Sequence, residues 1–136
     1  MDRLFLDANV LFSAAYRPGA GLLRLWKLKN VVLCSSRYAV AEANLNLDDV
    51  SQHKRLAELA QKLQLFEAPA RELPRGISLP EKDVPILLAA IVAQATHLLT
   101  GDVRDFGPCF GKKIEGVMIV LPGEYLRGVR KIGSSP

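Results

Sequence analysis

Residues 3–14 read Arg-Leu-Phe-Leu-Asp-Ala-Asn-Val-Leu-Phe-Ser-Ala, and this stretch decides the fold. Its first part, residues 3–6, is a short apolar run that ends at Asp7, which is typical of a strand buried on both faces. Residues 8–16 predict a short helix, because Pro18 and Gly19 stop the helical pattern soon after it. A buried strand that leads through an acid into a helix is the repeating unit of an α/β protein.

The rest of the chain repeats this alternation of strands and helices. Apolar runs rich in β-branched residues predict four more strands, at residues 31–34, 65–66, 97–100 and 116–121. Helical spacing of apolar residues predicts four more helices, at residues 22–28, 37–47, 51–63 and 84–95. The prolines between residues 69 and 80 exclude a regular helix, so that segment is predicted to be a loop. The tail, residues 124–136, is expected to begin as a helical turn and to fray from about residue 131.

Length and composition narrow the class of protein. The chain has 136 residues, so we expect a single domain over residues 1–136. Hydrophobic residues make up 49% and charged residues 24%, which excludes a disordered chain. No apolar run reaches the roughly 18 residues of a membrane span, and no signal peptide is expected. Two cysteines and two histidines are too few for a disulfide framework or a zinc site, so we expect a cytoplasmic protein. Because no membrane span is predicted, we expect no membrane partner.

Acidic residues gather at one edge of the predicted sheet. Strands that alternate with helices predict an α/β fold with a mostly parallel sheet, and such sheets bind ligands outside the carboxyl ends of their strands. Four acids stand near these ends, after strands or on the helices next to them: Asp7, Glu42, Asp83 and Asp102. Asp105, three residues beyond the last of them, is a fifth.

Each acid also has an ordinary structural explanation. Asp7 would be the N-cap of the following helix, and Asp83 opens a favourable cap sequence with proline in the first turn. Asp102 follows a glycine as many turn residues do, and Glu42 would be a solvated helix residue. The presence of all of them at one sheet edge favours a shared role.

A cluster of carboxylates has a specific chemistry. The negative charges repel one another, and a cation relieves that repulsion. Oxygen ligands suit Mg²⁺ or Mn²⁺, and one or two such ions activate water and stabilise the leaving oxygen of a phosphodiester. Other chemistries lack their motifs, because the chain has no G-x-x-x-x-G-K-[ST], no G-x-G-x-x-G and no G-x-S-x-G.

Four segments carry a resemblance to a known family. Residues 4–14, Asp83-Val-Pro-Ile-Leu-Leu-Ala-Ala and Leu99-Thr-Gly-Asp-Val-Arg-Asp-Phe106 resemble the first, third and fourth motifs of the PIN domain. Ala39-Val-Ala-Glu42 stands where that family keeps its second acid. The match runs from about residue 3 to residue 122 and is most similar to the VapC-like branch of toxin–antitoxin toxins.

The resemblance implies a fold, an activity and a set of site residues. It implies a three-layer α/β/α sandwich around a mostly parallel five-stranded sheet in the order 3-2-1-4-5. It also implies a ribonuclease that depends on Mg²⁺ or Mn²⁺ and cleaves single-stranded RNA. The implied catalytic metal ligands are Asp7, Glu42, Asp83 and Asp102. The implied auxiliary residues are Asp105, Asn9 as the residue that orients the first acid, and the hydroxyls of Ser13 and Thr100.

We therefore expect a metal-dependent endoribonuclease that acts as the toxin of a toxin–antitoxin pair. The alternative is a PIN-like module that binds RNA or protein without cleavage, and a plain α/β interaction domain is a third hypothesis. The expected partners are RNA, a cognate antitoxin and a second copy of the chain in a homodimer. The segment between Glu42 and Asp83 is short and proline-rich where the family carries a helical hairpin for protein contacts, so both protein partners stay open.

Basic residues are expected to supply the affinity for RNA. The chain has 18 lysines and arginines against 14 acids, a net charge of +4, and such a surplus favours contacts with phosphates. Arg104 lies within the fourth motif, and Lys112 and Lys113 follow it. The competing explanation is that these three residues are solvated surface charges.

Overall fold

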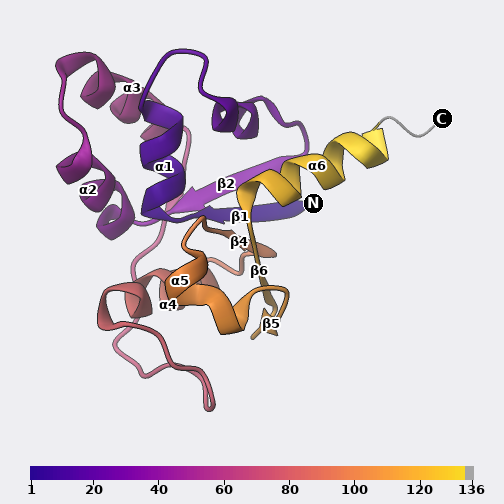
Figure 1. The fold of residues 1–136 in the computed structure, drawn as a ribbon. Coiled ribbons are helices and arrows are strands. Elements are labelled where there is room, and N and C mark those ends of the chain that lie inside the picture. The colour runs from indigo at the N-terminus through magenta and orange to yellow at the C-terminus, as the bar shows by residue number, and fades with distance from the viewer. Residues whose placement is uncertain (134–136) are drawn as a thin grey trace.

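The structure is a computed structural model that describes the backbone of residues 1–133 and the side chains of residues 1–129. Within this part of the chain, a six-stranded sheet in the order β3-β2-β1-β4-β6-β5 forms the centre (Figure 1). Its strands are β1 (Asp2–Leu6), β2 (Val31–Ser35), β3 (Gln64–Leu65), β4 (His97–Leu99), β5 (Lys113–Ile114) and β6 (Val117–Val120). Neighbouring strands pair in parallel except β5 and β6, which are antiparallel.

Helices cover both faces of the sheet. On one side lie α1 (Ala8–Ala15), α2 (Arg37–Asn46) and α3 (Val50–Ala60), and on the other lie α4 (Val84–Val92) and α5 (Val103–Phe106) (Figure 1). The remaining helices of the described residues are η1 (Gly21–Lys27), η2 (Glu81–Asp83), η3 (Gly107–Cys109) and α6 (Pro122–Gly133), the first three being 3₁₀ helices. The predicted three-layer α/β/α fold is confirmed. Among these helices, none is long and apolar enough to cross a membrane.

The sheet has one strand more than predicted. The five parallel strands follow the predicted order 3-2-1-4-5, but β5 adds a sixth at the edge next to β6. β5 and β6 form a hairpin through Glu115 and Gly116, whose φ angles are 44° and 88°. Positive φ at both central residues matches the tight turn that joins antiparallel strands. A strand of two residues, one of them Lys113, is too short to give an apolar pattern in the sequence.

Several helices differ from their predicted extents. The helix predicted at residues 84–95 is α4, which ends earlier, at Val92, and Gln94 beyond it has a φ of 54°. The helix predicted at residues 51–63 is α3, which begins earlier because Asp49 and Gln52 form a capping box, and which ends at Ala60. The tail begins as a helix, as predicted, and this helix, α6, runs to Gly133, while the fraying expected from about residue 131 stays a prediction. Its first half is anchored, since Leu126 is buried and the Tyr125 hydroxyl donates to the Asp2 carboxylate at 2.6 Å. Residues 134–136 lie outside the described residues.

The core fixes β1 and β4 side by side. Large apolar side chains of both strands are fully buried, namely Leu4, Phe5, Leu6, Leu98 and Leu99. Burial of each such side chain contributes roughly 1.5–3 kcal/mol to stability. The carboxyl ends of β1 and β4 therefore emerge from a rigid base, and side chains placed there keep their relative positions.

Candidate metal centre

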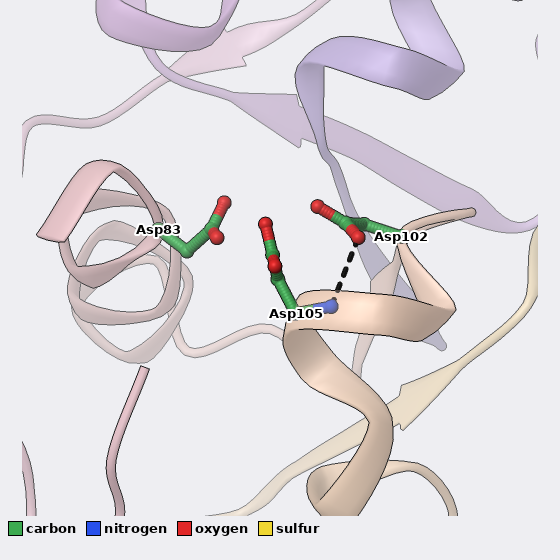
Figure 2. A group of neighbouring side chains, drawn as sticks. All are labelled: Asp83, Asp102 and Asp105. Carbon is green, nitrogen blue, oxygen red and sulfur yellow. Dashed lines mark hydrogen bonds between the residues drawn. The ribbon is translucent and has the colours of Figure 1, made fainter. Parts of the chain in front are cut away.

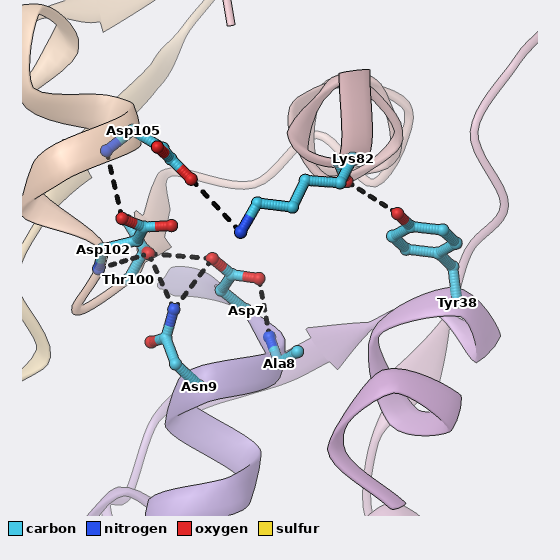
Figure 3. A network of polar contacts seen from close by, with 8 residues as sticks. All are labelled: Asp7, Ala8, Asn9, Tyr38, Lys82, Thr100, Asp102 and Asp105. Atoms are coloured by element: carbon cyan, nitrogen blue, oxygen red, sulfur yellow. Dashed lines mark hydrogen bonds and ion pairs between the residues drawn. The ribbon is translucent and has the colours of Figure 1, made fainter. Parts of the chain in front are cut away.

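Asp7 is buried where β1 ends and α1 begins. Its Oδ1 accepts a hydrogen bond from the Ala8 amide at 2.6 Å, so the side chain caps α1, as the structural explanation predicted. Its Oδ2 accepts from the Thr100 hydroxyl at 2.8 Å and from the Asn9 side-chain amide at 3.2 Å (Figure 3). One oxygen of Asp7 thus belongs to the helix start, while the other is held by residues around the end of β4.

Thr100 and Asn9 tie the ends of β1 and β4 together. The fully buried Thr100 hydroxyl accepts from the Asp102 amide at 3.1 Å and from the Asn9 side-chain amide at 3.3 Å. Asn9 Oδ1 in turn accepts from the Gly101 amide at 2.8 Å. A Cβ at Gly101 would lie only 3.3 Å from that oxygen, so glycine suits this close approach. The structure therefore brings two of the four predicted auxiliary residues, Asn9 and Thr100, into contact with Asp7.

We predict that Thr100→Val lowers the free energy of unfolding by about 1–3 kcal/mol. The change keeps the volume of the side chain but removes a donor to Asp7 and an acceptor for the Asp102 amide inside a buried site. Thr100→Ser, which keeps the hydroxyl, is the matched control. Denaturant unfolding of the three proteins measures the difference, and equal unfolding free energies would contradict this role of the hydroxyl.

Asp83 ends η2 at the start of α4 and is only 5% exposed. It occupies the N-cap position of α4 with proline in the first turn, as the sequence predicts, but its side chain makes no capping hydrogen bond. Its Oδ2 is buried and has no hydrogen-bond partner among the described residues. Burial, reinforced by the neighbouring carboxylates of Asp7, Asp105 and Asp102 and opposed by Lys82, raises the pKa of Asp83 to about 7. Asp83 is therefore the least satisfied carboxylate of the site.

Three carboxylates converge across the gap between α4 and α5. Asp83, Asp102 and Asp105 each offer an oxygen, and these oxygens lie within 4.8 Å of one another (Figure 2). Asp102 caps the short α5, because its Oδ1 accepts from the Asp105 amide at 3.0 Å. Asp105, expected only as an auxiliary residue, is thus part of the tightest acidic group, which we call the acidic triad.

Lys82 brings a positive charge to the acidic triad. Its Nζ lies 3.2 Å from Asp105 Oδ2 (Figure 3). The ion pair and hydrogen bond with Lys82 lower the pKa of Asp105, and the same contact raises the pKa of Lys82. The Tyr38 hydroxyl donates to the Lys82 carbonyl at 2.7 Å and fixes the turn that carries the lysine. Lys82 and Tyr38 were not among the site residues predicted from the sequence. The position of Lys82 directly before Asp83 could have indicated that it lies at the site.

The remaining predicted site residues line one open cleft of about 670 Å³. Glu42 on α2 and Ser13 on α1 line it together with Asp7, Asp83 and Asp102. Burial raises the pKa of Asp7, and the charges of Glu42 and Asp102 raise it further, while the Thr100 and Ala8 hydrogen bonds oppose them. All four predicted metal ligands therefore share one cleft, although Asp7 and Glu42 stand outside the acidic triad.

None of the three basic residues expected to contact RNA lines this cleft. In the sheet, Lys113 on β5 lies beside Met118 on β6, and Met118 lies beside His97, the first residue of β4. The acids follow the other end of β4. Lys112 precedes Lys113 and is exposed, and Arg104 is exposed on α5 without lining the cleft. The two lysines therefore lie far from the acids along the sheet, whereas Arg104 stands next to Asp105 on α5; contact of all three with RNA stays a prediction.

A parallel sheet in the order 3-2-1-4-5, covered by helices on both faces, defines a PIN-like α/β fold. The structure of the VapBC2 complex from Rickettsia felis, bound to a DNA fragment from their promoter, contains a similar chain. The likeness has a TM-score of 0.62 and 19% identity over 86% of this chain and 96% of that one. The FitAB complex bound to an IR36 DNA fragment contains another, with a TM-score of 0.51 and 19% identity over 88% and 94% of the two chains.

Similarity at this level of identity shows the fold alone. No family model matches the sequence, and no curated protein matches it either. The argument about function therefore depends on the residues of the site, because one fold can carry several activities.

Proposed function

We propose that the chain is a metal-dependent endoribonuclease that cleaves single-stranded RNA and acts as the toxin of a toxin–antitoxin pair. One observation carries the proposal: the acidic triad converges beside a buried Asp83 oxygen that has no partner among the described residues. A buried carboxylate oxygen without a partner is costly, and a cation relieves that cost. The donor set consists of hard oxygens and fits Mg²⁺ or Mn²⁺.

The chain's own residues would hold the metal and keep one another in place. Asp83, Asp102 and Asp105 would hold it, with Asp7 and Glu42 as further ligands on the same cleft. When bound, such an ion supplies the activation of water and the stabilisation of the leaving oxygen of a phosphodiester. Two hydrogen bonds already orient Asp7 Oδ2, and the Asp105 amide orients Asp102. Carboxylates fixed in this way need little rearrangement when the substrate arrives.

Lys82 has a role at the rim of the cleft. Its ammonium partly neutralises the acidic triad through Asp105, which lowers the repulsion of an incoming phosphate. The side chain is 58% exposed, so it can also donate a hydrogen bond to a phosphate oxygen.

RNA as the substrate and a toxin role rest on the resemblance to VapC-like toxins. The likeness to chains in the VapBC2 and FitAB complexes supports the toxin part of this assignment, whereas RNA as the substrate rests on the resemblance and on the acids of the site. By the same reasoning we propose a cognate antitoxin as the protein partner of this chain.

A cleavage assay tests the activity. We expect a labelled single-stranded RNA to be cut in millimolar Mg²⁺ or Mn²⁺ and to stay intact in EDTA. Asp83→Asn should abolish cleavage, and Glu81→Gln, which changes an exposed acid of the same η2 turn, should cleave like the parent protein. Calorimetry should detect the divalent ion in the parent protein and not in Asp83→Asn.

Two results would count against the proposal. Metal binding without cleavage of any RNA would favour the non-catalytic PIN-like module. Absence of divalent binding at millimolar concentration would remove the metal centre itself.

A further inference from the structure

A second groove continues from the metal cleft along α1. It has a volume of about 460 Å³ and shares the lining residues Phe12, Ser13 and Leu22 with the cleft. Beyond these residues it is bounded by the end of α1, by η1 and by the start of α6, which packs against η1. We call it the arginine groove, after two of its lining residues, Arg17 and Arg24.

An aromatic ring stands exposed in the arginine groove. Tyr16 is 53% exposed, and its ring lies 5.4 Å from that of Phe12 at an angle of 46°. The backbone below the ring is fixed, because the Tyr16 carbonyl accepts from the Gln52 side-chain amide at 3.0 Å. Exposed aromatic rings on a rigid base are the surfaces on which proteins stack unpaired bases of single-stranded RNA.

The charge of the arginine groove is opposite to that of the metal cleft. Arg17 and Arg24 are exposed, and neither forms an ion pair with an acid among the described residues. None of the described residues that line the groove is acidic. A third guanidinium is close, since a Cβ on Gly123, another lining residue, would lie 3.5 Å from Arg127 Nη1. A polyanion that is repelled by the acids therefore meets positive charge directly beside them.

We infer that the arginine groove binds an unpaired nucleotide of the RNA next to the phosphate that is cleaved. The base of this nucleotide lies against the Tyr16 ring, and the nucleotide's own phosphate contacts Arg17 and Arg24. This inference rests on the proposed function and adds to it a substrate subsite. A segment of a partner protein would also fit a groove of this size, but an exposed ring among unpaired arginines favours a nucleotide.

Binding of a labelled single-stranded RNA of about ten nucleotides tests the inference, in the Asp7→Asn background that keeps the RNA intact. Tyr16→Ala should weaken binding by about tenfold, and Tyr16→Phe, which keeps the ring, should bind like its parent. The double variant Arg17→Ala/Arg24→Ala should flatten the salt dependence by about 1.4 log units of affinity per tenfold change in salt. Arg75→Ala removes an exposed arginine outside the groove and should change little.

Cleavage kinetics of the otherwise unchanged protein give a second readout. Tyr16→Ala should raise KM for RNA with little change in kcat, because the Tyr16 ring contacts the base and not the reacting phosphate. Groove variants that bind and cleave RNA like the parent would overturn this inference and leave the proposed function standing. Unchanged RNA binding and cleavage by these variants are also expected if the arginine groove binds a partner protein instead of a nucleotide. A parent protein that neither binds nor cleaves RNA in the presence of metal would overturn both.

Discussion

Asp7→Asn should abolish metal-dependent cleavage while the protein stays folded. An asparagine oxygen still caps α1, since asparagine is as good an N-cap as aspartate. The substitution removes the negative charge and one oxygen at the point where Thr100 and Asn9 orient the carboxylate. A metal ion stabilises the transition state by several kcal/mol, so we expect cleavage to fall by roughly a hundredfold to a thousandfold or more.

Single-turnover cleavage of a labelled RNA, together with thermal unfolding, measures this effect. Asp48→Asn is the control, because it neutralises an exposed aspartate outside the metal cleft. If Asp7→Asn cleaved RNA at the parent rate, the helix-cap role would be the whole role of Asp7. If it failed to fold, the hydrogen bonds to Thr100 and Asn9 would depend on the charge of Asp7.

The second large effect concerns pH. Without divalent ions, the protein should lose stability as the pH rises from about 4 to about 7. Burial raises the pKa of Asp83 from 3.8 to about 7, so within this window the folded protein holds a proton that the unfolded chain releases. The free energy of unfolding then falls as the pH rises through this window. Asp7, whose pKa is also raised, changes stability in the same direction.

Thermal unfolding in EDTA at pH 5, 6, 7 and 8 measures this slope. Asp83→Asn should flatten it, because the amide has no proton to lose, whereas Glu81→Gln should leave it unchanged. Divalent ions should reverse the trend, since they bind the ionised carboxylates and stabilise the folded state by about 2.7 kcal/mol at a hundred times the Kd. If the melting temperature in EDTA did not depend on pH, ionisation of Asp83 would cost the folded protein no stability, and the prediction would be wrong.

Much of the fold follows from local patterns, because buried parallel strands are apolar runs and the helices between them carry periodic apolar residues. The sheet edge that holds the acids could be predicted for the same reason, since Asp7 and Asp102 directly follow strands. β5 could not be predicted, as two residues in a tight hairpin carry no pattern of their own. The anchoring of α6 depends on contacts of Tyr125 and Leu126 with the rest of the fold, which no local pattern shows.

Within the site, only the structure shows which of the predicted residues lie close together. Asp83 and Asp105 are 22 positions apart, and only the placement of η2 and α5 in the fold makes them neighbours. Lys113 follows the fourth motif closely, yet the hairpin carries it to the opposite end of the sheet. The arginine groove joins α1, η1 and α6, so its residues come from both ends of the chain.

The pairing of β1 with β4 also has a consequence for biosynthesis. The hydrogen bond from Thr100 to Asp7 joins residues 93 positions apart, and Asp102 and Asp105 follow even later. Contacts so distant in sequence form late, after the loop between them has closed. A chain still on the ribosome with only its first 96 residues exposed contains Asp7, Glu42 and Asp83 but lacks β4 and the rest of the acidic triad. The nascent chain therefore stays without a complete site until residues 97–105 have left the ribosome, and the order of synthesis itself delays the onset of any nuclease activity.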